Sequence, residues 1–457
     1  MTGADRLDST RNGAAVAPWR EKWPVKAFFV VSVALLFLGF FRNQWGAARD
    51  GKFRNFQRDS EILVIGRLVE SRQHGIFSSA GFLGAGDVEQ HTVKEEERFF
   101  DYQYEVYLSG GAFDTVSTYR SQSGGQGWLF SALDALSPST PWVNLRLFHV
   151  LTSLALAVAL ALLVQWALLE FGWISAAVML ISALASPWLT VYGRNLFYVA
   201  GFYYLPMAAA TVYLARNSER QGRLRLGLAG VLFGTVAAKC LLNGYDYILP
   251  SAGMPAIPIV FYAVRDRWQR SEFIRQAALA ATAALVAIVL TLALLAAQNA
   301  ILSGSFTDGV RLIMGRLAQR TGATSDSAAG GSAGIPVNTL EILRTYVVSD
   351  LAVGQTSLRF LDLIALYGAA TAVYFLRERL LPIGPQTTRN GRALIAATWL
   401  SILSPILWYT IFKGQAYFHT HTNFLAWYMP FTLLGFALCG FVVQVLLFRA
   451  PRDAART

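Results

Sequence analysis

The chain has 457 residues, a formal net charge of +11, 54% hydrophobic residues and only 15% charged residues. So few charged residues exclude an ordinary globular enzyme, and the long apolar runs are typical of an integral membrane protein. Two cysteines without CxxC spacing, Cys240 and Cys439, argue against a metal site built on thiolates.

Ten apolar runs are spaced along the chain, at about 27–44, 145–165, 173–191, 196–215, 226–243, 249–264, 277–300, 358–376, 393–412 and 424–448. Most reach the roughly 18 to 20 residues that a helix needs to cross a hydrocarbon core of about 30 Å. The sixth run is short and contains Pro250, Pro255 and Pro258, which favours a broken or re-entrant helix. The sequence therefore predicts an all-α polytopic membrane protein with about ten transmembrane helices.

The charged residues predict how these helices are oriented. If the N-terminal tail lies inside, the inside segments are 1–26, 166–172, 216–225, 265–275, 377–392 and 449–457, which together contain 20 basic and 9 acidic residues. The whole net charge of +11 then lies on one side, as the positive-inside rule requires. The positive charge therefore reports topology. It does not indicate nucleic-acid binding, which would need a basic patch on a folded soluble surface.

This topology sets the expected organisation of the chain. A cytosolic tail (1–26) and a first transmembrane helix (27–44) precede a large outer loop (45–141), helices two to seven (142–300), a second outer loop (301–357), helices eight to ten (358–448) and a final tail (449–457). The first apolar run is long and lacks a small-residue cleavage site, so we expect it to be retained. In the second outer loop, the Ser-, Ala- and Gly-rich stretch 321–334 predicts a flexible segment, either a lid or a stretch without a role.

Residues 58–77 begin with two carboxylates, Asp59 and Glu61. The apolar residues that follow recur at helical spacing, and Arg67 and Glu70 fall on the opposite face. A short amphipathic helix of this kind would lie along the bilayer surface and hold its carboxylates at the boundary between lipid and water. The alternative role for both carboxylates is helix capping and compensation of the helix dipole.

Other polar side chains in the outer segments are candidates for substrate contacts. Arg120 and Gln122 precede a glycine-rich run that allows close backbone approach, or they belong to a simple polar turn. Arg194 is the single basic residue in the hairpin between the third and fourth spans. It is either a phosphate ligand or a snorkelling side chain beside an aromatic belt of Trp188 and Tyr192.

Charged and polar residues also lie close to the outer end of the fifth span, at Lys239, Tyr245 and Asp246. Charges at such depth are costly, so they usually point into a cavity or pair with each other. The sequence therefore predicts either a contribution to a substrate site or a structural pair of Lys239 with Asp246.

The last two outer loops contain further basic side chains. The loop 301–357 has three arginines at helical spacing: Arg311, Arg316 and Arg320. The final loop contains Lys413, His419 and His421, which could hydrogen-bond a phosphate or a sugar or could be plain interfacial polarity. A His-x-His metal site would need further ligands that this loop lacks.

All of these constellations fall on the outer side, and the inside loops are short and basic. The sequence has no P-loop and no dinucleotide fingerprint, which disfavours a nucleotide-using enzyme that faces the cytosol. What remains is chemistry or binding at the outer leaflet.

The chain resembles the GT-C superfamily of membrane glycosyltransferases, which includes protein mannosyltransferases, aminoarabinose transferases and oligosaccharyltransferases. The acidic motif Asp59-Ser60-Glu61, followed by Gly66-Arg67 and then His74-Gly75-Ile76-Phe77, is similar to the acid, arginine and glycine succession of that family. The stretch 186–206 resembles its hairpin between the third and fourth spans. The family often has adjacent Asp-Glu, whereas a serine separates the two carboxylates here, and a His-Pro element late in the first loop is missing.

The resemblance implies an inverting transfer of a hexosyl or pentosyl group from a polyprenyl-phosphate donor to a glycan, lipid or protein acceptor. It also implies a bacterial inner membrane, with the site facing the periplasm or exterior. Asp59 or Glu61 would be the general base, and both could instead hold a divalent cation. Stabilisation of the departing phosphate would fall to four basic residues: Arg194, Lys239, Lys413 and His419.

Two other classes of membrane protein stay open. A ligase or polymerase of lipid-linked glycans would use Arg194 and His419 centrally, with the carboxylates secondary. A transporter or flippase would more often contain internal repeats and charged residues at mid-membrane. The two halves of the sequence show no repeat, and the large asymmetric outer loop argues against a transporter.

Overall fold

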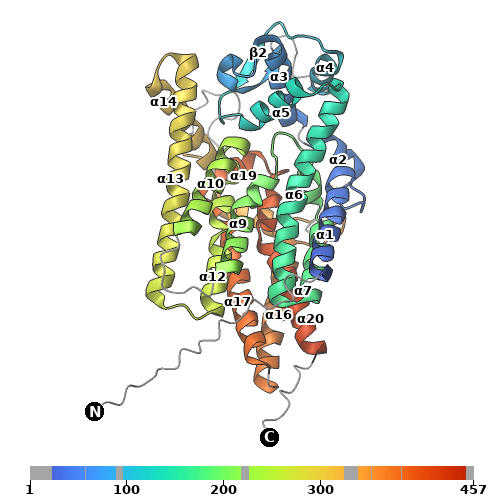
Figure 1. Cartoon of the computed structure of the whole chain (residues 1–457), viewed down its shortest axis with the longest axis vertical. Helices are drawn as coiled ribbons and strands as arrows, with labels where there is room; N and C mark the ends of the chain where they lie inside the picture. The colour runs from blue at the N-terminus through green and yellow to red at the C-terminus, as the bar shows by residue number, and fades with distance from the viewer. Residues whose placement is uncertain are drawn as a thin grey trace, which may run out of the picture.

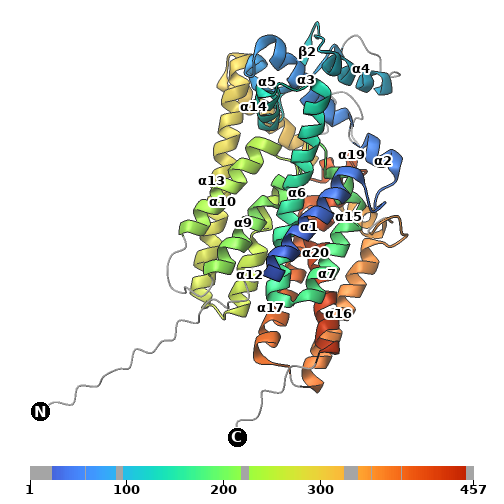
Figure 2. The ribbon, with the colours of Figure 1, turned by 45° about the vertical axis from the view of Figure 1, so that its right-hand side comes forward.

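The computed structural model describes residues 23–56, 58–88, 96–217, 226–323, 338–350, 353–381 and 383–448. A bundle of long apolar helices bears a small folded unit at one end (Figures 1 and 2). In this described part of the chain, 7 helices are long and apolar enough to cross a membrane. The predicted class, a mainly helical multi-pass membrane protein, is therefore confirmed.

The seven long apolar helices are α1 (Trp23–Arg42), α6 (Pro141–Phe171), α10 (Leu226–Asn243), α11 with α12 (Ile248–Arg265), α13 (Arg270–Ser303), α16 (Phe360–Leu380) and α17 with α18 (Pro385–Ile411). Three of the ten predicted spans correspond to shorter helices: α7 (Trp173–Leu184), α9 (Gly201–Asn217) and α20 (Phe431–Leu447). How many helices cross the bilayer therefore stays a prediction.

Prolines divide two of the predicted spans. The sixth is split into α11 (Ile248–Gly253) and α12 (Ala256–Arg265), with Pro255 at the break, as its prolines predicted. The third is not one helix over 173–191, because α7 ends at Leu184 and a separate short helix, α8 (Pro187–Tyr192), follows. The Ser186 hydroxyl accepts a hydrogen bond from the Leu189 amide at 3.1 Å and so starts α8 as a new helix.

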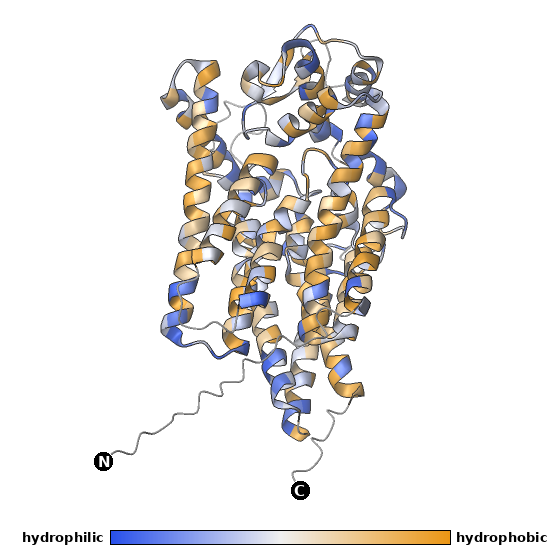
Figure 3. Cartoon of the chain, in the orientation of Figure 1, coloured by the Kyte–Doolittle hydropathy of each residue, from blue (hydrophilic) through white to orange (hydrophobic). Residues whose placement is uncertain are grey.

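Hydropathy follows the axis of the bundle (Figure 3). Apolar residues dominate along the helices, and polar residues gather at the two ends. At the end opposite the folded unit, Arg265 lies 2.7 Å from the Glu170 carboxylate, and the Asn390 side chain donates to the Glu170 carbonyl oxygen at 2.6 Å. These contacts join α6, α12 and α17 where the positive-inside rule predicts the cytosolic surface.

The helices pack closely where small residues face each other, and α7 against α20 is one example. A Cβ atom at Gly440 of α20 would lie 2.8 Å from the carbonyl oxygen of Ile174 and from the Cα atom of Ser175. Because both are backbone atoms, the two helices would have to separate to admit a side chain.

We therefore expect Gly440→Ala to lower the melting temperature of the detergent-purified protein. Gly234→Ala in α10 is the matched control, because a Cβ there meets nothing within 4 Å. In an open helix position, alanine is favoured over glycine by about 0.5–1 kcal/mol. The packing would be looser than described if both variants melted at or above the wild-type temperature.

The folded unit at the end of the bundle, residues 50–136, is called the cap. It contains α2 (Asp50–Asn55), α3 (Arg58–His74), the 3₁₀ helix η2 (Ser78–Gly81), β1 (Leu83–Gly86), α4 (Glu96–Ser109), β2 (Val116–Tyr119) and α5 (Gly125–Leu136). The two strands pair antiparallel, with Leu83 opposite Tyr119. An all-α prediction missed this small sheet, because four-residue strands are too short to show an alternating pattern.

Helix α3 lies at the centre of the cap, between the sheet, α4 and α5. The predicted amphipathic helix on the bilayer surface is wrong, because in the middle of α3 polar side chains are buried as well as apolar ones. Arg67 is 1% exposed and donates to the Ser78 carbonyl oxygen at 2.6 Å, and Glu70 accepts from the Ser79 hydroxyl at 2.9 Å. A Cβ atom at Gly66 would lie 2.0 Å from a carbonyl oxygen of β1, so this glycine allows the sheet to pack on α3.

Four further short elements come from the second half of the chain: α14 (Phe306–Thr321), α15 (Thr339–Val348), α19 (Lys413–Phe418) and the 3₁₀ helix η5 (Asn423–Tyr428). Of these, α14 lies beside the cap (Figure 2). Of the predicted flexible stretch 321–334, only residues 321–323 are among the described residues, so the lid hypothesis stays a prediction.

Candidate functional site

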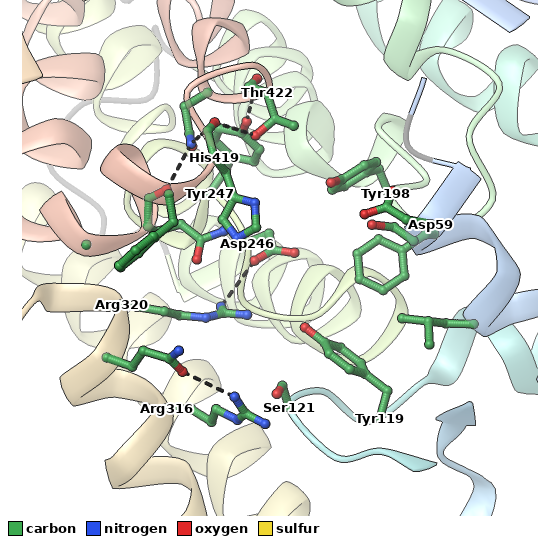
Figure 4. A pocket seen from close by; sticks show the side chains of 18 of the residues that line it. Asp59, Tyr119, Ser121, Tyr198, Asp246, Tyr247, Arg316, Arg320, His419 and Thr422 are labelled. Atoms are coloured by element: carbon green, nitrogen blue, oxygen red, sulfur yellow. Dashed lines mark hydrogen bonds and ion pairs between the residues drawn. The ribbon is translucent and has the colours of Figure 1, made fainter. Parts of the chain in front are cut away.

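A cavity of about 340 Å³ lies where the cap meets the bundle, and we call it the main cavity (Figure 4). Its walls come from the first turn of α3, the end of β2, the segment before α9, the turn after α10, α14, and α19 with the turn that follows it. Its polar and charged lining residues are Asp59, Ser60, Tyr119, Ser121, Tyr192, Tyr198, Asp246, Tyr247, Arg316, Gln319, Arg320, Gln415, His419, Thr422 and Asn423.

Asp59 is in the first turn of α3 and is exposed to the main cavity. Its carboxylate makes no hydrogen bond or ion pair with any other residue that the structure describes. Figure 4 shows it beside Tyr198 and across the cavity from the two arginines of α14. A carboxylate with this exposure and no protein cation of its own can accept a proton from a bound molecule.

Glu61 lies only two positions further along α3 but does not line the main cavity. Residues two apart on a helix point about 200° apart, so the side chain turns to the opposite side. There its carboxylate accepts hydrogen bonds from the Tyr104 hydroxyl at 2.6 Å and the Leu196 amide at 3.0 Å, and it lies 3.0 Å from Nε2 of His149. Burial alone would raise the pKa of Glu61, but these three partners together lower it to about 2.

The cationic wall of the main cavity comes from α14. Arg316 and Arg320 are four residues apart and therefore share one face of this helix. Arg320 lies 3.1 Å from the Asp246 carboxylate, and Arg316 donates to the Gln319 side chain at 3.1 Å. Burial by itself would lower the pKa of the Arg320 guanidinium, but the Asp246 carboxylate and Tyr119 together outweigh burial, and the pKa is raised.

His419 follows α19 and lines the main cavity near these arginines (Figure 4). Its carbonyl oxygen accepts hydrogen bonds from the Thr422 hydroxyl at 2.9 Å and the side-chain amide of Asn423 at 2.8 Å, which fixes the turn. His421 is 6.1 Å from it between ring centroids, and burial together with His419 lowers the pKa of His421. Lys413 is not among the lining residues of the main cavity.

Lys239 is fully buried under the turn that carries Asp246. Its ammonium group donates to the carbonyl oxygens of Gly244 and Asp246, each at 2.6 Å. The predicted ion pair between Lys239 and Asp246 is therefore wrong. The Asp246 carboxylate pairs with Arg320, and the Lys239 ammonium group binds main-chain carbonyl oxygens. Tyr245 packs against the core, outside the main cavity.

Arg194 also lies outside the main cavity. It donates to the Phe53 carbonyl oxygen at 3.2 Å, and its guanidinium is 4.2 Å from the centre of the Phe53 ring. Trp188 and Tyr192 are 3% and 0% exposed, so the alternative of an aromatic belt around this arginine is wrong.

Two other candidate residues join the cap to the bundle. Arg120 donates to the side-chain and main-chain oxygens of Asn299 in α13, at 2.8 and 3.1 Å. Gln122 is 2% exposed and lies against Gly244, where an added Cβ would come within 1.9 Å of its side-chain oxygen. Neither of them, nor the buried Arg67, is among the lining residues of the main cavity.

Of the candidate residues, the main cavity therefore contains Asp59, Asp246 and His419. The arginines of α14 had a visible signal in their helical spacing but were not assigned to a site. The tyrosines of the cavity, such as Tyr119 and Tyr198, had no signal of their own, because aromatic residues occur throughout this sequence.

A divalent cation shared by Asp59 and Glu61 does not fit this geometry, because the two carboxylates face different cavities. Over the described ranges, no three His, Cys, Asp or Glu side chains converge on a point where they could hold a metal ion. Cys240 and Cys439 are free thiols.

Comparison with known protein families, curated protein sequences and solved structures finds no match to this chain. What the protein does must therefore follow from the geometry of the main cavity.

Proposed function

We propose that the protein is an integral membrane glycosyltransferase that uses a polyprenyl-phosphate sugar as donor, with the main cavity as its active site. One observation carries this proposal. The Asp59 carboxylate, unpaired among the described residues, faces a cavity that also contains Arg316, Arg320 and His419. A base opposite a group of cations suits transfer from a phosphate leaving group to a hydroxyl acceptor.

In the proposed reaction, the acceptor hydroxyl oxygen attacks the anomeric carbon from the side opposite the phosphate. As the new glycosidic bond forms, the bond from the anomeric carbon to the phosphate oxygen breaks. The phosphate leaves with that electron pair, and Asp59 takes the proton of the hydroxyl. The product is an inverted glycoside. Arg316, Arg320 and His419 would neutralise the charge that develops on the phosphate.

The position of the main cavity also supports a lipid-linked donor. It lies at the cap end of a bundle whose helices are apolar along their length, so a polyprenyl chain could stay in the bilayer while its phosphate reaches the cavity. By the positive-inside rule the cap would face the exterior, which in a bacterial inner membrane is the periplasm. A soluble or membrane-bound glycan, a lipid or a protein could then supply the hydroxyl.

We expect Arg316→Gln to lower kcat/KM for the donor by about 10- to 100-fold, because one charge-assisted contact to phosphate contributes about 1.5–3 kcal/mol. Arg311→Gln is the matched control, since it is an exposed arginine of the same helix that does not line the main cavity. Initial rates are measured at several donor concentrations with protein purified in lipid. Equal effects of the two substitutions would argue against a phosphate at this wall.

A ligase or polymerase of lipid-linked glycans is the second candidate, with Arg194 and His419 acting together. The positions of these residues favour the glycosyltransferase instead, since His419 lines the main cavity and Arg194 lines a separate one. A transporter is also less well supported, because the charged groups of the main cavity gather at one end of the bundle rather than at its middle.

A further inference from the structure

A second cavity of about 220 Å³ lies on the other side of the first turn of α3. Three arginines from three elements line it: Arg54 of α2, Arg58 of α3 and Arg194 of the segment between α8 and α9. His149 of α6 and the carboxylate of Glu61 complete its charged lining.

The only carboxylate in this lining is already engaged. Glu61 holds hydrogen bonds from Tyr104 and Leu196 and contacts His149, so its negative charge is shared among groups that surround it. Nearby, Arg58 pairs with Asp101, whose side chain is 60% exposed. An exposed ion pair of this kind contributes little and is readily exchanged for a better partner.

The other two arginines keep unused donors. Arg54 is exposed, and its guanidinium makes no hydrogen bond or ion pair within the described ranges of the chain. Arg194 is part-buried and donates through one nitrogen to the Phe53 carbonyl oxygen, while its flat face rests on the Phe53 ring. Stacking of this kind fixes the plane of a guanidinium and leaves its remaining N–H groups directed outward.

We propose that this second cavity is a binding site for a phosphate group. Arginine forks match the oxygen geometry of phosphate, and arginines from three elements can surround one. The cavity of about 220 Å³ has room for a phosphate group. Bound there, the anion bridges α2, α3 and the segment between α8 and α9, and so fastens the cap to the bundle.

The phosphate can come from a phospholipid head group or from a soluble phosphate ester. The cavity is lined by residues of the cap and by residues of α6, α8 and the segment after α8. On the topology expected from the positive-inside rule, this junction is near the outer membrane surface, where a lipid head group or a soluble ester could enter. This site is separate from the proposed reaction and does not depend on it, because none of its three arginines lines the main cavity.

The test is binding of inorganic phosphate, and of short-chain phosphatidylglycerol, to the full-length protein in neutral detergent. Calorimetry gives the affinity and native mass spectrometry gives the number bound. We expect Arg54→Gln to lower the affinity for one bound anion by at least about 10-fold, and Arg194→Gln to abolish binding of that anion. Arg316→Gln should leave this anion in place, whatever it does to binding in the main cavity. Arg311→Gln should change nothing.

Binding of phosphatidylglycerol alone assigns the site to a lipid head group, and binding of inorganic phosphate as well assigns it to soluble esters too. The proposal is overturned if the wild type binds neither. It is also overturned if Arg54→Gln and folded Arg194→Gln bind as the wild type does, or if Arg316→Gln alone removes all binding. The last result would leave the proposed function intact.

Discussion

Asp59→Asn is expected to lower the rate of sugar transfer by about 10²- to 10⁴-fold without changing the melting temperature. Asparagine keeps the shape of the side chain but cannot take the proton of the attacking hydroxyl. Stability should be unaffected, because the Asp59 carboxylate has no ion pair or hydrogen bond among the residues described. Initial rates with a labelled donor and thermal unfolding of the same preparation check both halves of the expectation.

Asp50→Asn is the matched control for this substitution. Asp50 is an exposed aspartate in the first turn of α2, and it does not line the main cavity. Its replacement should leave both rate and stability at the wild-type level. If Asp59→Asn retained half of the wild-type rate, Asp59 would not be the base.

Glu61→Gln is expected to keep sugar transfer but to lower the free energy of unfolding by about 3 kcal/mol at pH 7. The pKa of Glu61 is lowered to about 2 by its partners, from an ordinary value of 4.5, and each unit of such a shift is worth about 1.4 kcal/mol. Glutamine leaves the neighbouring His149 without its carboxylate and cannot accept as many hydrogen bonds.

The pH dependence follows from the same lowered pKa. A carboxylate with a depressed folded pKa stabilises the protein fully above its unfolded pKa of about 4.5, and this contribution is lost as the pH falls toward 2. The gap in melting temperature between wild type and Glu61→Gln should therefore narrow as the pH falls below 4.5. Glu105→Gln, at an exposed position of α4, is the control and should melt at the wild-type temperature at every pH. If the difference in melting temperature between wild type and Glu61→Gln widened below pH 4.5, the assigned ionisation of Glu61 would be contradicted.

Hydropathy predicted the bundle well because long apolar runs have few alternatives to a membrane helix. The predicted fifth span, 226–243, has the same limits as α10, and the first matches α1 within four residues at each end. The seventh, 277–300, lies inside the longer α13. Burial of charged residues in the cap was not predictable in the same way. Arg67 looks like a surface residue in the sequence. In the interior it donates to the carbonyl oxygens of Gly75 and Ser78, which the fold brings close to it.

The candidate site was predictable in part. The acidic motif drew attention to Asp59 and Glu61, and helical geometry alone separates them, since residues two apart face opposite sides. The helical spacing of Arg316 and Arg320 was visible in the sequence. Their approach to Asp59 depends on the packing of α14, α19 and the cap around one cavity, which no local pattern in the sequence records.

Transfer of labelled sugar by the purified wild-type protein, from a panel of polyprenyl-phosphate donors in lipid, tests the proposed function most directly. Asp59→Asn and Glu61→Gln are assayed beside it, at a temperature where all three are folded. We predict transfer from at least one donor by the wild type and by Glu61→Gln, and none above background by Asp59→Asn. Transfer by Asp59→Asn at the wild-type rate, or no transfer by the wild type from any donor, would contradict the proposal.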